Sequence, residues 1–208
     1  MRVSSASRAR TAKPRKKIGQ DPVRRAQLVL LLLWVVANFF SELLQEISFY
    51  FETMFAVAQW LVLRLCFPKI GYWILVSIWG WILAVITVFY FEFDSLISPH
   101  IPGINVPVMG LALTWQEYGT AISVKSFVWL VIGLLQWLLL RCYLEKAFWW
   151  IPASTFGATL KGALESIFTT LDLSTVGVLI GACGYATMTG LVLIWLLKEN
   201  LNAYSLSS

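Results

Sequence analysis

The chain has 208 residues, of which 59% are hydrophobic and only 13% are charged, and its mean hydropathy is +0.74. A soluble domain carries nearer a quarter charged residues, so this composition excludes an ordinary soluble domain and indicates a surface that faces hydrocarbon. A spanning helix needs about 20 mostly apolar residues, so the length allows about six or seven spans and no separate soluble domain.

The net charge of +5 is concentrated at the start of the chain, because nine of the sixteen Lys and Arg residues lie in residues 1–27. This distribution predicts a disordered cytoplasmic tail that meets anionic lipid headgroups, and it argues against nucleic acid as a partner. Residues 1–20 are rich in Arg and Ser and contain no acidic residue, so an organellar transit peptide is the alternative interpretation.

Apolar runs predict an all-α bundle of six transmembrane helices within residues 28–200. The spans are expected at 28–45, 48–66, 70–91, 122–143, 148–170 and 174–197. A model with four spans would fuse 28–66 into one helix of about 58 Å, nearly twice the hydrocarbon thickness. The long connection 92–121 and a short polar tail at 201–208 complete the chain.

The positions of the basic residues predict the orientation. With the N-terminus in the cytoplasm, 14 of the 16 Lys and Arg residues fall on the cytoplasmic side, and only Lys125 and Lys161 do not. The acidic residues, Glu42 among them, fall near the other face. The positive-inside rule therefore places both termini in the cytoplasm, and the loop 92–121 outside, in a cell inner membrane or a thylakoid membrane.

An internal repeat supports this count of spans. Residues 59–64 return as residues 136–141, and 11 of 25 residues are identical between 59–83 and 136–160. The pattern is typical of a degenerate helical-hairpin repeat.

Each copy of the repeat contains a Trp and an Arg four residues apart, Trp60 with Arg64 and Trp137 with Arg141. This spacing stacks each pair on one helix face. The pairs are typical of interface anchors, strengthened by a cation–π contact. The second interpretation is that the two Arg residues bind a lipid phosphate or another anion at the cytoplasmic rim.

Four further polar residues fall within the predicted spans. Gln59 and Gln136 are expected to form hydrogen bonds between helices, with each other or as part of a polar site. Lys161 and Glu165, four residues apart, predict an ion pair inside the bundle, or alternatively a pair at the outer interface.

The last span contains small residues at short intervals, which predict a helix-packing face. Its members are Gly177, Gly181, Gly184 and Gly190.

No catalytic motif and no metal-binding cluster is found, and three cysteines without CxxC spacing indicate buried thiols. The single histidine, His100, lies in a Pro-flanked loop, where a solvated side chain is the simplest expectation. The sequence therefore predicts neither catalytic nor metal-binding residues, and it leaves any cofactor unidentified.

The repeated Q-W-L-x-L-R pattern and the final span, 181–191, resemble a loose class of multi-pass bacterial membrane proteins, especially cyanobacterial ones. The resemblance covers about residues 50–90 and 130–197 and implies topology rather than chemistry. We expect a non-enzymatic structural, assembly or accessory subunit that contacts a membrane-protein partner or a second copy. The alternative is a transporter or channel for a small solute, ion or lipid, with Lys161 and Glu165 inside the bundle.

Overall fold

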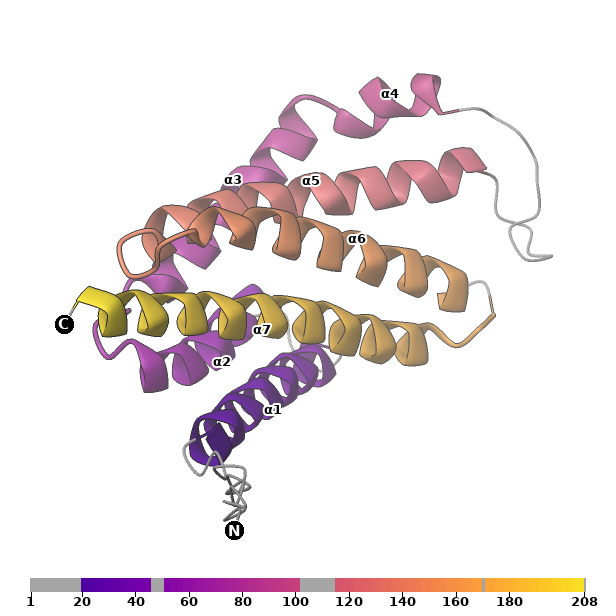
Figure 1. Ribbon diagram of the computed structural model, residues 1–208. Helices are drawn as coiled ribbons and strands as arrows, with labels where there is room; N and C mark the ends of the chain where they lie inside the picture. Colours follow the sequence, from indigo (N-terminus) through magenta and orange to yellow (C-terminus); the bar gives the residue numbers. More distant parts are fainter. Residues whose placement is uncertain (1–19, 46–50, 102–114, 170, 208) are drawn as a thin grey trace, which may run out of the picture.

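The computed structural model describes residues 20–45, 51–101, 115–169 and 171–207, and every regular element in these ranges is a helix (Figure 1). The elements are α1 (Gln20–Gln45), α2 (Phe51–Cys66), α3 (Trp73–Tyr90), α4 (Phe93–Ile97), η1 (Ser98–His100), α5 (Trp115–Leu140), η2 (Ala147–Trp149), α6 (Trp150–Thr169) and α7 (Ser174–Ser207). Most of the basic tail, the junction 46–50 and the middle of the loop 92–121 lie outside the described residues.

A long helix lies at each of the six positions where a span is predicted, and four of these helices are long and apolar enough to cross a membrane. The four segments are Arg24–Leu44, Trp73–Tyr90, Tyr118–Leu140 and Ser174–Asn200. The apolar part of α2, Thr53–Cys66, is shorter, and α6 contains two charged residues. The described residues are thus all-helical, with four helices suited to cross a membrane by length and composition, which confirms the predicted fold class at that level.

Several helices extend beyond the predicted spans. α1 already begins at Gln20 and α7 continues to Ser207, so part of each predicted tail is helical. Pro22 lies in the first turn of α1, where its missing N–H leaves no hydrogen bond unmade. α5 begins at Trp115, which shortens the connection predicted at 92–121.

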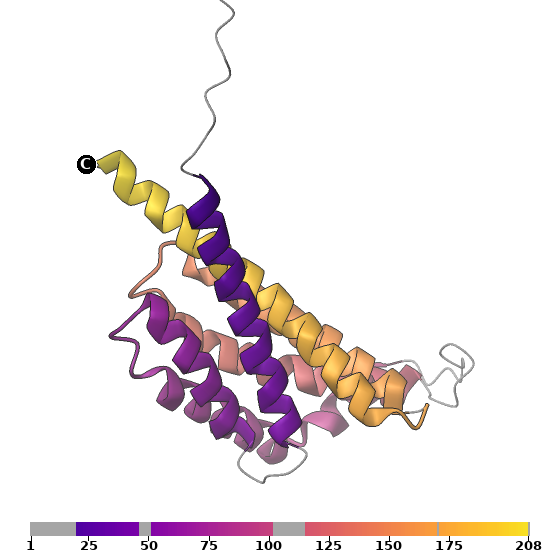
Figure 2. The same ribbon diagram turned by 90° about the horizontal axis from the view of Figure 1, so that it is seen from below.

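The six long helices form a closed ring in which neighbours in the sequence are also neighbours in space. α1 packs against α2, α2 against α3, α3 against α5, α5 against α6, and α6 against α7, while α7 closes the ring onto α1. Figures 1 and 2 show α1 lying across α7. Helices α2 and α3 follow α1 around the ring. Because the helices alternate in direction, α1 and α6 run the same way through the bundle.

Aromatic side chains fill the centre of the ring. Trp34, Trp73 and Trp150 are fully buried, and the ring of Trp150 meets the other two edge to face at centroid distances of 5.9 and 5.8 Å. Such pairs contribute about 0.5–1.5 kcal/mol each beyond the area they bury. A second cluster consists of Phe55, Trp129 and Tyr185.

Residues 77 positions apart occupy matching environments. Gln59 and Gln136 are both fully buried, and so are Trp73 and Trp150. A duplicated hairpin would produce this correspondence, because the two copies would present the same face to the centre of the bundle.

The connection between α5 and α6 is fastened to the end of α7. Lys146 adopts a left-handed backbone conformation with φ 58°, and its ammonium lies 2.7 Å from a carboxylate oxygen of Glu199. Asn200 accepts a hydrogen bond from the backbone N–H of Glu145 at 2.9 Å. These two contacts hold the connection between α5 and α6 against the last turns of α7.

Candidate functional site: a buried ionic tetrad

Four charged side chains from three helices form a chain of alternating sign, which we call the ionic tetrad. Lys161 Nζ donates to Glu42 Oε1, and Lys125 Nζ donates to Glu165 Oε2. Lys161 Nζ also lies 3.5 Å from Glu165 Oε1, which joins the two pairs. The order Glu42, Lys161, Glu165, Lys125 therefore links α1 to α6 and α6 to α5.

The tetrad is buried at one end and accessible at the other. The side chain of Glu42 is 1% exposed, that of Lys161 10% and that of Glu165 14%, whereas that of Lys125 is 44% exposed. Ionised groups at this depth are costly unless each has a counter-charge. Since two ammonium groups face two carboxylates, the formal charges of the tetrad sum to zero.

Helix periodicity places the buried members of the tetrad. Trp34, Asn38 and Glu42 follow each other at four-residue steps on α1, so they form one stripe toward the centre of the ring, and all three are buried. The same four-residue step aligns Lys161 with Glu165 on α6. Because α1 and α6 run in the same direction, Trp34 in the middle of α1 meets Trp150 at the start of α6, and Glu42 meets Lys161 further along both helices.

Two glycines make room for the two lysine stems. A Cβ atom at Gly181 of α7 would lie 2.9 Å from Lys161 Cγ and 3.2 Å from Lys161 Cα. A Cβ atom at Gly162 of α6 would lie 2.9 Å from Lys125 Cδ. The close contact at Gly181 lets the stem of Lys161 run along α7 while its ammonium reaches Glu42 of α1. The contact at Gly162 lets the stem of Lys125 run along α6 toward Glu165 of the same helix.

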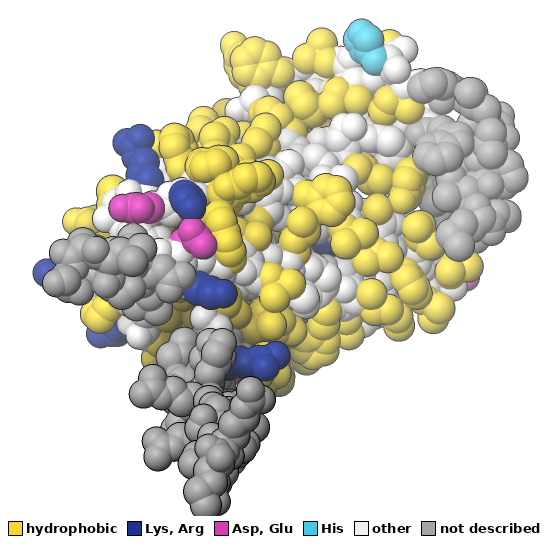
Figure 3. Space-filling view, viewed as in Figure 1, with side chains coloured by type: hydrophobic (Ala, Val, Ile, Leu, Met, Phe, Trp, Pro, Cys, Tyr) yellow, Lys and Arg dark blue, Asp and Glu magenta, His cyan; other side chains and the backbone are white. Residues whose placement is uncertain are grey.

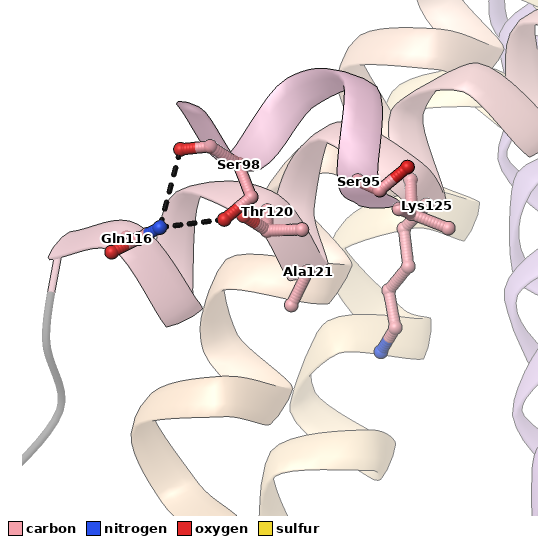
Figure 4. A pocket seen from close by; sticks show the side chains of 7 residues that line it. Ser95, Ser98, Gln116, Thr120, Ala121 and Lys125 are labelled. Atoms are coloured by element: carbon pink, nitrogen blue, oxygen red, sulfur yellow. Dashed lines mark hydrogen bonds between the residues drawn. The ribbon is translucent and has the colours of Figure 1, made fainter. Parts of the chain in front are cut away.

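An open groove of about 770 Å³ lies beside the exposed end of the tetrad, between α4, η1 and the first turns of α5. We call it the polar groove after the hydroxyl, amide and ammonium side chains that line it, although most of its wall area is apolar. Figure 4 shows its side chains, with Lys125 extending away from the hydroxyl groups. Gln116 Nε2 donates to Ser98 Oγ at 2.6 Å, which ties the start of α5 to η1. The remaining polar residues that line the groove are Ser95 and Thr120.

Two buried oxygen atoms of this region have no hydrogen-bond partner. One is Glu42 Oε2 at the deep end of the tetrad, and the other is Thr120 Oγ1 in the wall of the groove. A buried oxygen without a donor costs about 1–3 kcal/mol. The region thus has hydrogen-bond accepting capacity that the described residues do not use.

The structure confirms the predicted Lys161–Glu165 ion pair but changes its setting. Glu42, expected near a turn at the outer face, is instead a buried residue of α1 and the closest counter-charge of Lys161. Lys125 was an exception to the positive-inside distribution, and so was Lys161. Both exceptions are now explained, since each lysine is paired with a carboxylate.

Gln59 and Gln136 both bond to other helices, as predicted, but not to each other. Gln59 Nε2 donates to Asn38 Oδ1 at 2.9 Å, which joins α2 to α1. Gln136 Nε2 donates to Ser77 Oγ at 3.0 Å, and Gln136 Oε1 accepts from Trp150 Nε1 at 2.9 Å. Both amides therefore hold helices together, and neither touches the tetrad.

The two matching segments also differ at the hydrogen bond between the tryptophan indole and the glutamine amide. The indole N–H of Trp73 corresponds to that of Trp150, yet Trp73 Nε1 and Gln59 Oε1 are both buried without a partner. The amide network is therefore complete in the second copy and incomplete in the first.

The predicted Trp–Arg pairs are present at the basic end of the bundle. Arg64 lies over the ring of Trp60 at 5.2 Å from the centroid, and Arg141 over that of Trp137 at 5.4 Å. Figure 3 shows Lys and Arg side chains gathered at the left end, while most of the other visible surface is hydrophobic. The predicted anion-contact residues thus lie at the opposite end from the polar groove.

The predicted packing face of α7 is divided between two neighbours. Gly177 and Gly181 abut α6, whereas Gly190 abuts Trp34 of α1. Gly184 has only an ordinary van der Waals neighbour at 3.8 Å. Three of the four glycines therefore lie at close helix contacts.

No group of three or more potential metal-ligating residues is found among the residues that the structure describes. Comparison of the chain with protein-family models, with curated proteins and with solved structures gives no match. The site is therefore interpreted from its own geometry.

Proposed function

We propose that this chain is a non-enzymatic membrane protein that binds a small zwitterionic solute at the ionic tetrad and passes it across the membrane. The observation that supports this function best is the chain of four alternating charges that ends in the polar groove. It favours the transporter hypothesis over a purely structural role, because a buried ionic network stabilises a fold weakly and is more often retained for function.

The charge balance of the tetrad selects the class of solute. A simple anion or cation would leave one unbalanced charge in a poorly solvated place. A zwitterion keeps the balance, since its carboxylate replaces Glu165 beside Lys125 while its ammonium replaces Lys125 beside Glu165. Thr120 offers a further hydrogen-bond partner in the wall of the groove.

The proposal includes the topology expected from the sequence. All six long helices span the membrane, both termini and the basic end face the cytoplasm, and the groove faces the other side. The two hairpins of α2–α3 and α5–α6 descend from one duplicated unit, as in the cyanobacterial-like membrane proteins that the chain resembles. The membrane is a cell inner membrane or a thylakoid membrane.

Equilibrium dialysis of the purified protein in detergent tests the solute. We expect saturable binding of glycine and of glycine betaine, and no saturable binding of acetate or methylammonium. Lys125→Met and Glu165→Gln should abolish binding, whereas Lys146→Met, which breaks an exposed ion pair at the other end, should leave it unchanged. Equal binding of acetate or methylammonium would contradict the charge-balance argument.

Flux into proteoliposomes tests the second half of the proposal. A solute that binds to the wild-type protein should enter vesicles in a protein-dependent manner, and the same two variants should abolish entry. Flux that persists in both variants would remove the tetrad from the pathway.

A second candidate, an accessory subunit of a membrane complex, is supported by two tryptophans in the middle of α3. Trp79 is 62% exposed and Trp81 36% exposed, although tryptophan favours the membrane interface over the hydrocarbon centre. Residues two positions apart do not share a helix face, so the two rings point to nearly opposite sides of α3. A protein neighbour on the Trp79 side of α3 would explain the position of the more exposed ring. Purification in mild detergent distinguishes the candidates, because an accessory subunit should bring a stoichiometric partner that Trp79→Ala releases.

A further inference from the structure

An apolar groove of about 380 Å³ lies at the basic end of the bundle, where α1, α2 and α7 meet. It is separate from the polar groove, which is formed by α4, η1 and α5. Its wall contains Ala26, Leu30 and Leu33 of α1, Leu65 and Cys66 of α2, and Leu197 of α7.

Each of the three helices that form this groove has an exposed cation directly beside a lining residue. Arg25 precedes the α1 wall, Arg64 precedes the α2 wall and Lys198 follows the α7 wall. Glu199, the acid that follows Lys198, pairs with Lys146. The groove thus combines an apolar wall with a rim of positive charge, and no ion pair of these three cations is found among the residues whose side chains are described.

We propose that this groove binds an acidic phospholipid of the surrounding leaflet. An acyl chain fits the apolar wall, and the lipid phosphate accepts hydrogen bonds from the cations of the rim. A guanidinium can bind two phosphate oxygens at once, so Arg64 is the residue best suited to hold the headgroup. A free phosphate would use the rim but leave the apolar wall empty.

The second copy of the repeat provides a matched comparison. Arg141 corresponds to Arg64 and makes the same contact with its tryptophan, but Cys142 and Tyr143, which correspond to Leu65 and Cys66, are not among the residues that line this groove. A general attraction of basic residues to anionic membranes would involve both arginines equally. A built lipid site depends on Arg64 and not on Arg141.

The thiol of Cys66 reports occupancy, because it lines the groove. The test uses the full chain with Cys142→Ser and Cys183→Ser, reconstituted in phosphatidylcholine vesicles with increasing phosphatidylglycerol, and measures the rate of maleimide labelling. We expect phosphatidylglycerol to slow the labelling of Cys66. A second protein that keeps only Cys142, which is exposed, should be labelled at a constant rate.

Variants then test the rim. Arg64→Ala and Arg25→Ala should each raise the phosphatidylglycerol fraction needed for half protection about fivefold, and Arg141→Ala should not. Arg64→Lys should restore part of the protection, since it keeps the charge and loses the bidentate contact. Size-exclusion chromatography verifies that each variant is folded.

Three results would overturn the proposal. The first is equal protection by phosphatidylcholine alone, which would indicate a non-selective contact with lipid. The second is an equal loss with Arg141→Ala, which would indicate general surface attraction. The third is protection by inorganic phosphate in phosphatidylcholine vesicles, which would indicate a free-anion site.

Discussion

Replacing Lys161 with Met removes the ammonium from the centre of the ionic tetrad and keeps a long unbranched stem. Glu42 then has no ion-pair partner among the described residues, while Glu165 keeps Lys125. Breaking a buried ion pair by removing one partner costs about 3–5 kcal/mol, because an uncompensated charge remains. We therefore expect Lys161→Met to lower the free energy of unfolding by about this amount.

Removing the stranded carboxylate should reverse most of this loss. In the double variant Glu42→Gln with Lys161→Met, no buried charge lacks a partner, so the double variant should be more stable than Lys161→Met alone. The coupling energy between the two sites should reach about 2 kcal/mol, since contacting residues in one network are strongly non-additive. Lys125→Met is the matched control, and because its side chain is 44% exposed it should cost about 1 kcal/mol or less.

Equilibrium unfolding in mixed dodecylmaltoside and dodecyl sulfate micelles measures these differences by circular dichroism. The same titration followed by tryptophan fluorescence reports on the buried cluster of Trp34, Trp73 and Trp150. The reasoning would be refuted if the changes in unfolding free energy of Glu42→Gln and Lys161→Met, each measured alone, sum to that of the double variant within about 0.5 kcal/mol. That agreement is the level expected of independent sites. It would equally fail if Lys125→Met were as destabilising as Lys161→Met.

Two further comparisons use matched residues in the same unfolding assay. Gln136→Leu removes two buried hydrogen bonds, those to the indole N–H of Trp150 and to the Ser77 hydroxyl. Gln59→Leu removes one, that to Asn38 Oδ1, because the Gln59 carbonyl oxygen already lacks a donor among the described residues. Gln136→Leu should therefore cost about 1–3 kcal/mol more, and equal costs would contradict the amide network. Gly181→Ala should cost about 1–3 kcal/mol because its Cβ meets the backbone of α6 at 3.2 Å. Gly184→Ala, with its nearest neighbour at 3.8 Å, should change stability by less than about 0.5 kcal/mol, and a reversed order would show that the close contact at Gly181 is not limiting.

Local patterns predicted those features of the site that depend on one helix. The four-residue steps from Trp60 to Arg64 and from Lys161 to Glu165 lie within single helices, so helix geometry alone brings the side chains together. The six helix positions followed from apolar runs in the same way. The helix ends were less predictable, because α1 and α7 continue past their apolar segments.

The partners of the polar residues were not predictable in this way. Gln59 and Gln136 are equivalent in the repeat, and yet one bonds to Asn38 of α1 and the other to Ser77 of α3. The difference arises because the first hairpin lies beside α1 while the second lies between α3 and α7. One feature of the sequence pointed to the role of Lys125, namely that it is an exception to the predicted distribution of basic residues.

The sequence by itself determined that this protein is helical, apolar and basic at one end, since hydropathy, periodicity and charge are properties of short segments. Only the tertiary structure decided that Glu42 meets Lys161, 119 residues away, and that Lys125 meets Glu165 across 40 residues. The reason is physical: a buried charge must find its counter-charge wherever helix packing brings one within reach, and that packing is set by the whole ring rather than by any one segment.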